Sequence, residues 1–168
     1  MTQPERKWLA KALQDLLLPK LEGAGFTRLP LSGPDASSAE IRAAFPFGRL
    51  RRARGDGFDQ VEIQLDKRGS PAFRLNMGVI PRQGIAHPVA HVEPEQAWVQ
   101  YLPRYCELYQ RAWTRTWFKL SRWPGASPSE ADYRALVERA AALLPEIESA
   151  FDETKALPFA SHLRRVRA

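Results

Sequence analysis

A chain of 168 residues with 44% hydrophobic residues is long enough for one sizeable core and short for two. The formal charge of +6 favours contact with an acidic partner such as nucleic acid or an anionic protein. The single cysteine, Cys106, excludes an internal disulfide framework and a cysteine-based zinc site. The N-terminus has no apolar signal-peptide core and no run is long enough to span a membrane, so we expect one cytoplasmic domain over residues 1–168 without membrane contact.

The N-terminal segment is predicted to form an amphipathic helix. Residues 2–5, Thr-Gln-Pro-Glu, have the form of a capping box that begins a helix. Gly23 and Gly25 predict its end, because glycine takes the left-handed conformation that closes helices. The apolar stripe at helical spacing consists of Trp8, Leu9, Ala12, Leu13, Leu16, Leu17 and Leu21.

The middle of the chain changes from helical spacing to alternation. Residues 26–31 predict a short strand, and the polar residues 32–38 predict a loop. From about residue 43, three extended runs are separated by turn residues at 55–57 and 69–71. This order is typical of an antiparallel β-meander.

Each of the second and third runs has an apolar and a polar face. The apolar positions are Val61, Ile63, Leu65, Phe73, Leu75, Met77 and Val79. The polar positions include Gln60, Glu62, Gln64, Arg74 and Asn76. The apolar face is the surface that we expect the helices to cover.

Residues 81–123 are harder to interpret. Four prolines lie between 81 and 104, and the stretch is predicted to be irregular with one short helix near 95–102. Residues 105–123 are dense in aromatic residues and arginine, and their spacing favours neither strand nor helix.

A second long helix is predicted near the C-terminus. Residues 127–130, Ser-Pro-Ser-Glu, have the form of a capping box with Pro128 at the first helical position. Pro145 predicts a kink or a restart, and the basic tail from about residue 156 is expected to fray. The predicted buried stripe is Tyr133, Leu136, Val137, Ala140, Leu143, Leu144 and Ile147.

These elements predict an α+β fold. A leucine-rich N-terminal helix and a long C-terminal helix are expected on one side of an antiparallel meander sheet built mainly from residues 43–80.

The order of these segments resembles the bacterial domain of unknown function 4304 family. Its members have a leucine-rich helix that ends in a Gly-Phe step, a strand that carries glutamine, and a strand of the form Phe-x-x-Asn-x-Gly. In this chain the matching positions are Gly25, Phe26, Gln64, Phe73, Asn76 and Gly78, and Trp117 before a capped helix is also similar. The resemblance covers about residues 9–150 and implies a fold, with no established activity.

Catalytic and metal-binding groups are not recognisable in the sequence. His87, His91 and Glu93 lie close together, but Pro88 and Pro94 oppose the helix that would place both imidazoles on one face. Cys106 has no histidine near it in sequence, and a lone cysteine among apolar residues is typical of a core position. We therefore assign no catalytic residue, metal or cofactor.

A basic and aromatic set offers a nucleic-acid alternative. Cations and aromatic rings together neutralise and stack single-stranded nucleic acid, whereas charges on a hairpin edge also serve to prevent edge-to-edge pairing. The residues of this alternative are Arg49, Arg51, Arg52, Arg54, Trp113, Arg115, Trp117, Lys119, Arg122 and Trp123.

The polar sheet face is the primary candidate binding site. Residues of one parity on paired antiparallel strands are neighbours, so Glu62, Gln64, Arg74 and Asn76 are expected side by side. Such a face binds a ligand or partner backbone, or it is exposed to solvent, or its Gln64 and Asn76 bond to a covering loop. We expect a non-enzymatic binding or regulatory module that contacts another protein, with single-stranded nucleic-acid binding and then an unrecognised hydrolase as alternatives.

Overall fold

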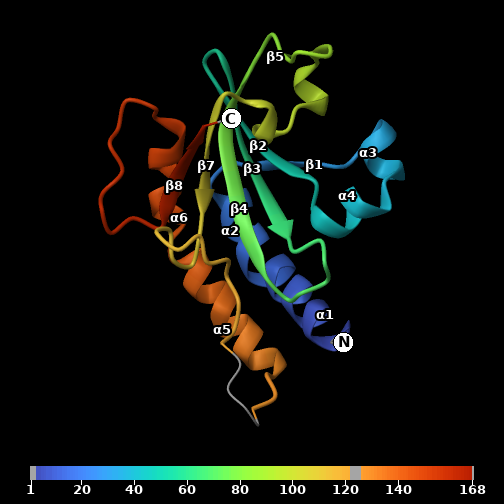
Figure 1. Ribbon diagram of the computed structural model, residues 1–168, viewed down its shortest axis with the longest axis vertical. Coiled ribbons are helices and arrows are strands. Elements are labelled where there is room, and N and C mark those ends of the chain that lie inside the picture. The colour runs from blue at the N-terminus through green and yellow to red at the C-terminus, as the bar shows by residue number, and fades with distance from the viewer. Residues whose placement is uncertain (1–2, 122–125, 168) are drawn as a thin grey trace.

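The computed structural model describes residues 3–121 and 126–167 (Figure 1). Its main sheet has six antiparallel strands in the order β1-β2-β3-β4-β7-β8. The strands are β1 (Thr27–Leu29), β2 (Arg49–Arg54), β3 (Gly57–Leu65), β4 (Phe73–Pro81), β7 (Arg104–Leu108) and β8 (Leu163–Arg167). A separate hairpin consists of β5 (Ile85–Ala86) and β6 (His91–Val92). The predicted α+β class with an antiparallel sheet is confirmed.

The centre of the sheet is the predicted meander of β2, β3 and β4. Nine residue pairs join β3 to β4, and Val61 opposite Met77 is typical of their apolar face. The sheet is wider than predicted, because β1 adds to one edge and β7 with β8 adds to the other.

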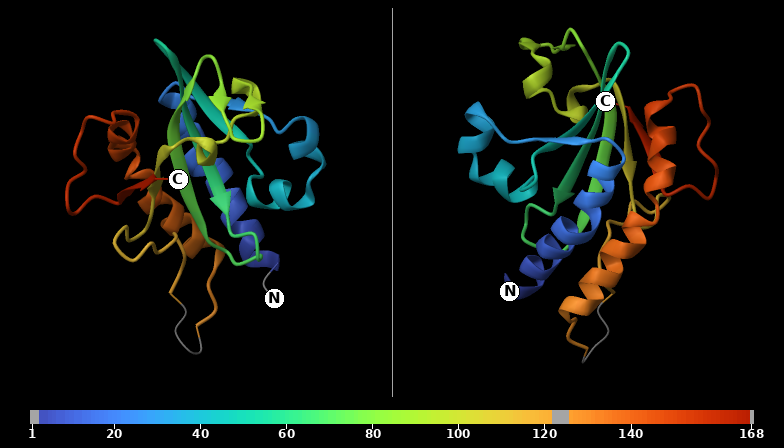
Figure 2. Two further views of the ribbon diagram at one scale, coloured as in Figure 1. Left: turned by 45° about the horizontal axis from the view of Figure 1, so that its top comes forward. Right: turned by 180° about the vertical axis from the view of Figure 1, so that it is seen from behind.

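The two ends of the chain provide the helices that cover the apolar face (Figure 2). The N-terminal part is one continuous helical run, formed by α1 (Gln3–Ala12), the π-helical η1 (Leu13–Leu17) and α2 (Leu18–Gly23). The C-terminal part consists of α5 (Glu130–Ala141), α6 (Leu144–Ile147) and the 3-10 turn η4 (Glu148–Phe151). The Tyr133 hydroxyl donates to Glu5 at 3.0 Å and joins α5 to α1. Within residues 3–121 and 126–167, no helix has the length and apolar character that crossing a bilayer requires.

The opposite face of the sheet is also covered. Residues 94–102, which we call the covering segment, contain the 3-10 turns η2 (Pro94–Gln96) and η3 (Val99–Tyr101) and lie across this face (Figure 2). A second apolar cluster packs between them and the sheet, formed by Ile80, Ile85, Ala97, Val99 and Leu102. Gly78 permits the close approach, since a Cβ there would lie 2.6 Å from Leu102 Cδ1.

The two capping boxes predicted from the sequence have different outcomes in the structure. Thr2 of the first predicted capping box lies outside the described residues. The second prediction was wrong in register: the cap of α5 is Ser129, whose hydroxyl accepts from the Asp132 N–H while the Asp132 carboxylate accepts from the Ser129 N–H. The Pro145 restart is confirmed, because α6 begins beside it.

Three further predictions were wrong. The loop predicted at 32–38 contains the short helix α3 (Gly33–Ser37), which is followed by α4 (Ala39–Ala44). The single helix predicted near 95–102 is two separate 3-10 turns. The tail predicted to fray forms β8, because residues 163–167 complete the ladder with β7.

Gly48, at the start of β2, provides a test of the close packing at the β1 edge. It has φ +69°, and a Cβ would lie 2.5 Å from the Leu29 carbonyl oxygen. We predict that Gly48→Ala lowers the free energy of unfolding by about 2 kcal/mol, because both the left-handed backbone and the contact penalise a side chain. Urea unfolding measures the change. The control is Gly23→Ala, which has no neighbour within 4 Å and lies in a helix; an equal loss in both variants would contradict the prediction.

Candidate functional site

The structure brings the four predicted site residues together on β3 and β4. Glu62 lies opposite Asn76 and Gln64 lies opposite Arg74. The Gln64 Oε1 accepts from Arg74 Nε at 3.0 Å and from Asn76 Nδ2 at 2.9 Å. Glu62 and Asn76 are fully buried, so this face is not the solvent-facing surface that a ligand would meet.

The covering segment bonds to the polar face through its backbone. The Gln60 Nε2 donates to the Ala97 carbonyl at 2.9 Å and to Glu62 Oε1 at 2.7 Å. The Val99 N–H donates to the same Glu62 oxygen at 2.8 Å. These bonds correspond to the loop-covered alternative considered from the sequence, but Glu62 and Gln60 make them rather than Gln64 and Asn76.

Glu62 is the most strongly perturbed carboxyl of this network. Complete burial raises the pKa of Glu62 to about 7, although hydrogen bonds from Val99, Gln60 and Gln100 and the charge of Arg49 act to lower it. Removal from water penalises the ionised form, and this effect exceeds the stabilisation from the donors.

Arg74 connects β4 to the strands and loops that follow. Its guanidinium forms an ion pair with Glu107 at 2.7 Å and lies 4.8 Å from the ring centre of Trp117. It also donates to the Tyr109 hydroxyl, which itself donates to Glu107. Trp117, a candidate for base stacking, is therefore half-buried against an arginine of the same chain.

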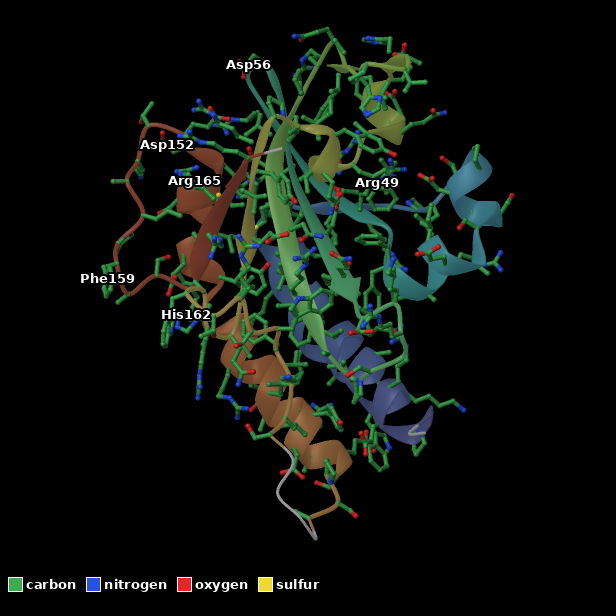
Figure 3. The ribbon with its side chains drawn as sticks, viewed as in Figure 1. Arg49, Asp56, Asp152, Phe159, His162 and Arg165 are labelled. Atoms are coloured by element: carbon green, nitrogen blue, oxygen red, sulfur yellow. The ribbon has the colours of Figure 1, made fainter. Side chains whose placement is uncertain are left out.

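The first two arginines of the basic run face the covering segment. Arg49 is fully buried, with its guanidinium 4.9 Å from the Trp98 ring centre (Figure 3). Arg51 donates from Nε to Gln60 at 2.5 Å and from Nη2 to the Pro94 carbonyl. Burial lowers the pKa of both, to about 10 for Arg51, where the charge of Arg49 adds to the effect.

The other two arginines face the helices and are paired. Arg52 contacts Asp59 and Glu148, each at 2.8 Å, and Arg54 contacts Asp59 at 3.0 Å. Asp59 itself is buried. The run at 49–54 therefore lies on two opposite faces of the sheet and does not form one free cationic surface. Arg122 and Trp123 of the same alternative lie outside the described residues.

The histidines and the cysteine do not form a recognised reactive group. His91 lies 3.6 Å from Glu93, and both side chains are exposed. Within the described ranges, no cluster of three or more His, Cys, Asp or Glu side chains is arranged to hold a metal ion. Cys106 is buried, and burial raises the pKa of its thiol, which disfavours the reactive thiolate.

The sequence did not predict an apolar hollow that lies beyond the C-terminal end of β7 and the N-terminal end of β8. We call it the end groove, with a volume of about 650 Å³. Trp113 and Phe159 are almost fully exposed there, at 84% and 110% of their reference areas. Figure 3 shows Phe159 and His162 on the loop that leads into β8. The groove is lined by Gln110, Arg111, Ala112, Trp113, Phe159, Ala160, Ser161 and His162.

Hydrogen bonds that continue the β7–β8 pairing, and others to α6, hold the walls of the end groove in place. The Tyr109 N–H donates to the His162 carbonyl at 3.0 Å. Glu146 of α6 accepts from the His162 N–H at 3.1 Å and from the Ser161 hydroxyl at 3.2 Å. The groove therefore has a fixed base, although the tips that carry Trp113 and Phe159 extend into solvent.

No protein-family model, curated protein or solved structure matches this chain.

The ion pair between half-buried Arg74 and buried Glu107 gives a direct test of the structural role of the polar face. We predict that Arg74→Met lowers the free energy of unfolding by about 3 kcal/mol, because Glu107 is left as a buried charge without its cation. The matched control is Lys67→Met, which removes an exposed ion pair with Glu40 and is expected to change stability by less than about 0.5 kcal/mol. Similar small effects of both variants in urea unfolding would show that the Arg74 pair is not structural.

Proposed function

We propose that this chain is a protein-binding module that uses the end groove and β8 to hold an acidic, extended segment of another protein. The observation that supports the proposal is the exposure of Trp113 and Phe159 on the walls of one apolar hollow. Large exposed apolar patches are uncommon on proteins without a binding role, and buried aromatic side chains often provide most of the energy of an interface.

The charge around the groove favours an acidic partner. Arg111 lies on the groove wall, and Arg164 and Arg167 lie on β8. Arg167 is exposed and lies directly opposite Arg104 in the β7–β8 pairing. Two like charges in this position repel each other, and a partner carboxylate between or beside them would stabilise them. A second copy of this chain is a poorer occupant, because each copy carries a formal charge of +6.

The place of β8 in the sheet favours an extended partner. β8 is the last strand in the order, so one edge of its backbone faces no other strand of the described sheet. Such edges accept an added strand from a partner. Residues 163–167 begin next to the groove and end at Arg167, so a segment of about five residues along β8 would reach both, at roughly 3.3 Å per residue.

Single-stranded nucleic acid is the alternative acidic ligand. It has less support, because Arg49 and Arg51 bond beneath the covering segment and Arg52 and Arg54 pair with carboxylates. An exposed Trp113 with Arg111 and Arg115 offers it a smaller surface.

The experiment uses three labelled probes and fluorescence anisotropy at low and moderate salt. The first is a short peptide of alternating glutamate and leucine, the second alternates lysine and leucine, and the third is a single-stranded oligonucleotide. We predict that the acidic peptide binds, that salt weakens its binding, and that the basic peptide does not bind. Trp113→Ala with Phe159→Ala is expected to weaken binding by about tenfold or more.

Matched variants distinguish binding in the end groove from nonspecific binding to other exposed apolar or charged side chains. Val89→Ala removes an equally exposed apolar side chain elsewhere and is expected to leave the affinity unchanged. Arg111→Glu with Arg167→Glu is expected to weaken acidic-peptide binding, whereas Arg68→Glu on the β3–β4 turn is expected to have only a small effect. Equal binding of both peptides, tighter binding of the oligonucleotide, or an unchanged affinity in the double aromatic variant would each overturn the proposal.

A further inference from the structure

Arg74 determines which side-chain atoms donate and which accept hydrogen bonds in this part of the polar network. An arginine nitrogen donates and never accepts, so the Gln64 atom 3.0 Å from Arg74 Nε is the amide oxygen. The Asn76 group 2.9 Å from that same oxygen is therefore the donor Nδ2. The amide orientations of Gln64 and Asn76 are both fixed by one guanidinium.

On the β2 side of the network, Arg51 fixes the orientation of the Gln60 amide. Arg51 Nε donates to Gln60 Oε1, so the Gln60 nitrogen donates to Glu62 Oε1 at 2.7 Å. The Val99 N–H donates to Glu62 Oε1 as well, at 2.8 Å. One carboxyl oxygen of Glu62 thus accepts two hydrogen bonds.

Two acceptors are left over, on residues that lie directly opposite each other. Asn76 Oδ1 and Glu62 Oε2 are both buried and have no hydrogen-bond partner among the described residues. The register pairs Glu62 with Asn76, which places their side chains side by side on one face. Two facing oxygens repel each other unless one of them carries a proton.

We propose that Glu62 is held as a neutral carboxylic acid whose Oε2–H donates to Asn76 Oδ1, and that this proton stabilises the covering segment on the sheet. The proton satisfies both remaining acceptors at once and leaves Oε1 free to accept from Val99. Loss of the proton leaves an unpaired buried charge next to a carbonyl oxygen, which weakens the closed arrangement of residues 94–102.

Burial favours the neutral form of Glu62, and it outweighs the opposing effect of the donors and the cation that face this carboxyl from the packed elements. Arg49 and Arg51 of β2 are the nearby cations. The Arg49 guanidinium stacks on Trp98 and donates from Nη1 to the Ala97 carbonyl, whereas its Nε and Nη2 are buried without a hydrogen-bond partner among the described residues. No ion pair between Arg49 and Glu62 is found in the described part of the chain, although both are buried. The remaining neighbours are Gln60 of β3, Asn76 of β4, Tyr105 of β7, and Gln100 and Tyr101 of η3.

The sign of the pH dependence follows from linkage. The pKa of Glu62 is about 7 in the closed arrangement, whereas the ordinary pKa of a glutamate in water is 4.5. When the covering segment opens and Glu62 meets water, the group ionises at the lower value. Opening is therefore favoured about tenfold for each pH unit between 4.5 and 7, and becomes independent of pH above 7.

The experiment records two signals of the whole chain by nuclear magnetic resonance. The carboxyl ¹³C shift of Glu62 reports its ionisation, and the Glu62→Gln variant, which lacks that signal, assigns it. The hydrogen-exchange protection of the Val99 N–H reports opening of the covering segment. We expect a midpoint near 7 for the carboxyl and a loss of protection of about fortyfold between pH 5 and 7, followed by a plateau at higher pH.

Variants isolate the role of the proton. In Glu62→Gln the amide keeps both a donor and an acceptor, so the protection of Val99 is expected to stay high and constant across this range. The matched control Glu138→Gln makes the same chemical change on the exposed side of α5, away from the network and from the end groove, and is expected to keep the wild-type profile. A Glu62 carboxyl already ionised at pH 5, or Val99 protection that does not change with pH in the wild-type chain, would overturn the proposal.

Discussion

The feature on which the rest of the structure depends is the burial of a polar sheet face beneath a short, irregular segment. Residues 94–102 bond to Gln60 and Glu62 through the Ala97 carbonyl and the Val99 N–H, and Gln60, Glu62 and Asn76 are fully buried. Burial of polar groups is costly unless each finds a partner, so this face is organised as a connected network. Donors from Arg51 and Arg74 set the direction of every amide within it.

This burial changes which part of the molecule is available for binding. With helices on one face and the covering segment on the other, little of the central sheet contacts solvent (Figure 2). The exposed aromatic rings and the outer edge of β8 lie at the margin instead. The polar residues of the centre act mainly in stability and in holding the covering segment, and the proposed partner surface is assigned to the end groove and β8.

The sequence predicted what depends on local pattern, and it failed where distant segments decide the outcome. The leucine stripe and the alternation at 58–80 follow from periodicities within one element, so the helix and the meander were predictable. Alternation at 60–64 looked like a solvent-facing polar side because Ala97 and Val99, which cover it, lie more than thirty residues away and show no regular period. The end groove joins residues 110–113 to 159–162, and Phe159 carries no signal beyond an apolar residue after a proline in a loop.

The most direct test of this account is the exchange of side-chain amide protons in D₂O. Gln60 and Asn76 lie in the buried network, whereas Gln96 is exposed on the covering segment itself. The account predicts that the amide protons of Gln60 and Asn76 persist long after those of Gln96 have exchanged. Exchange at the same rate for all three would show that water reaches the polar face, and would contradict the assignment of that face to the interior.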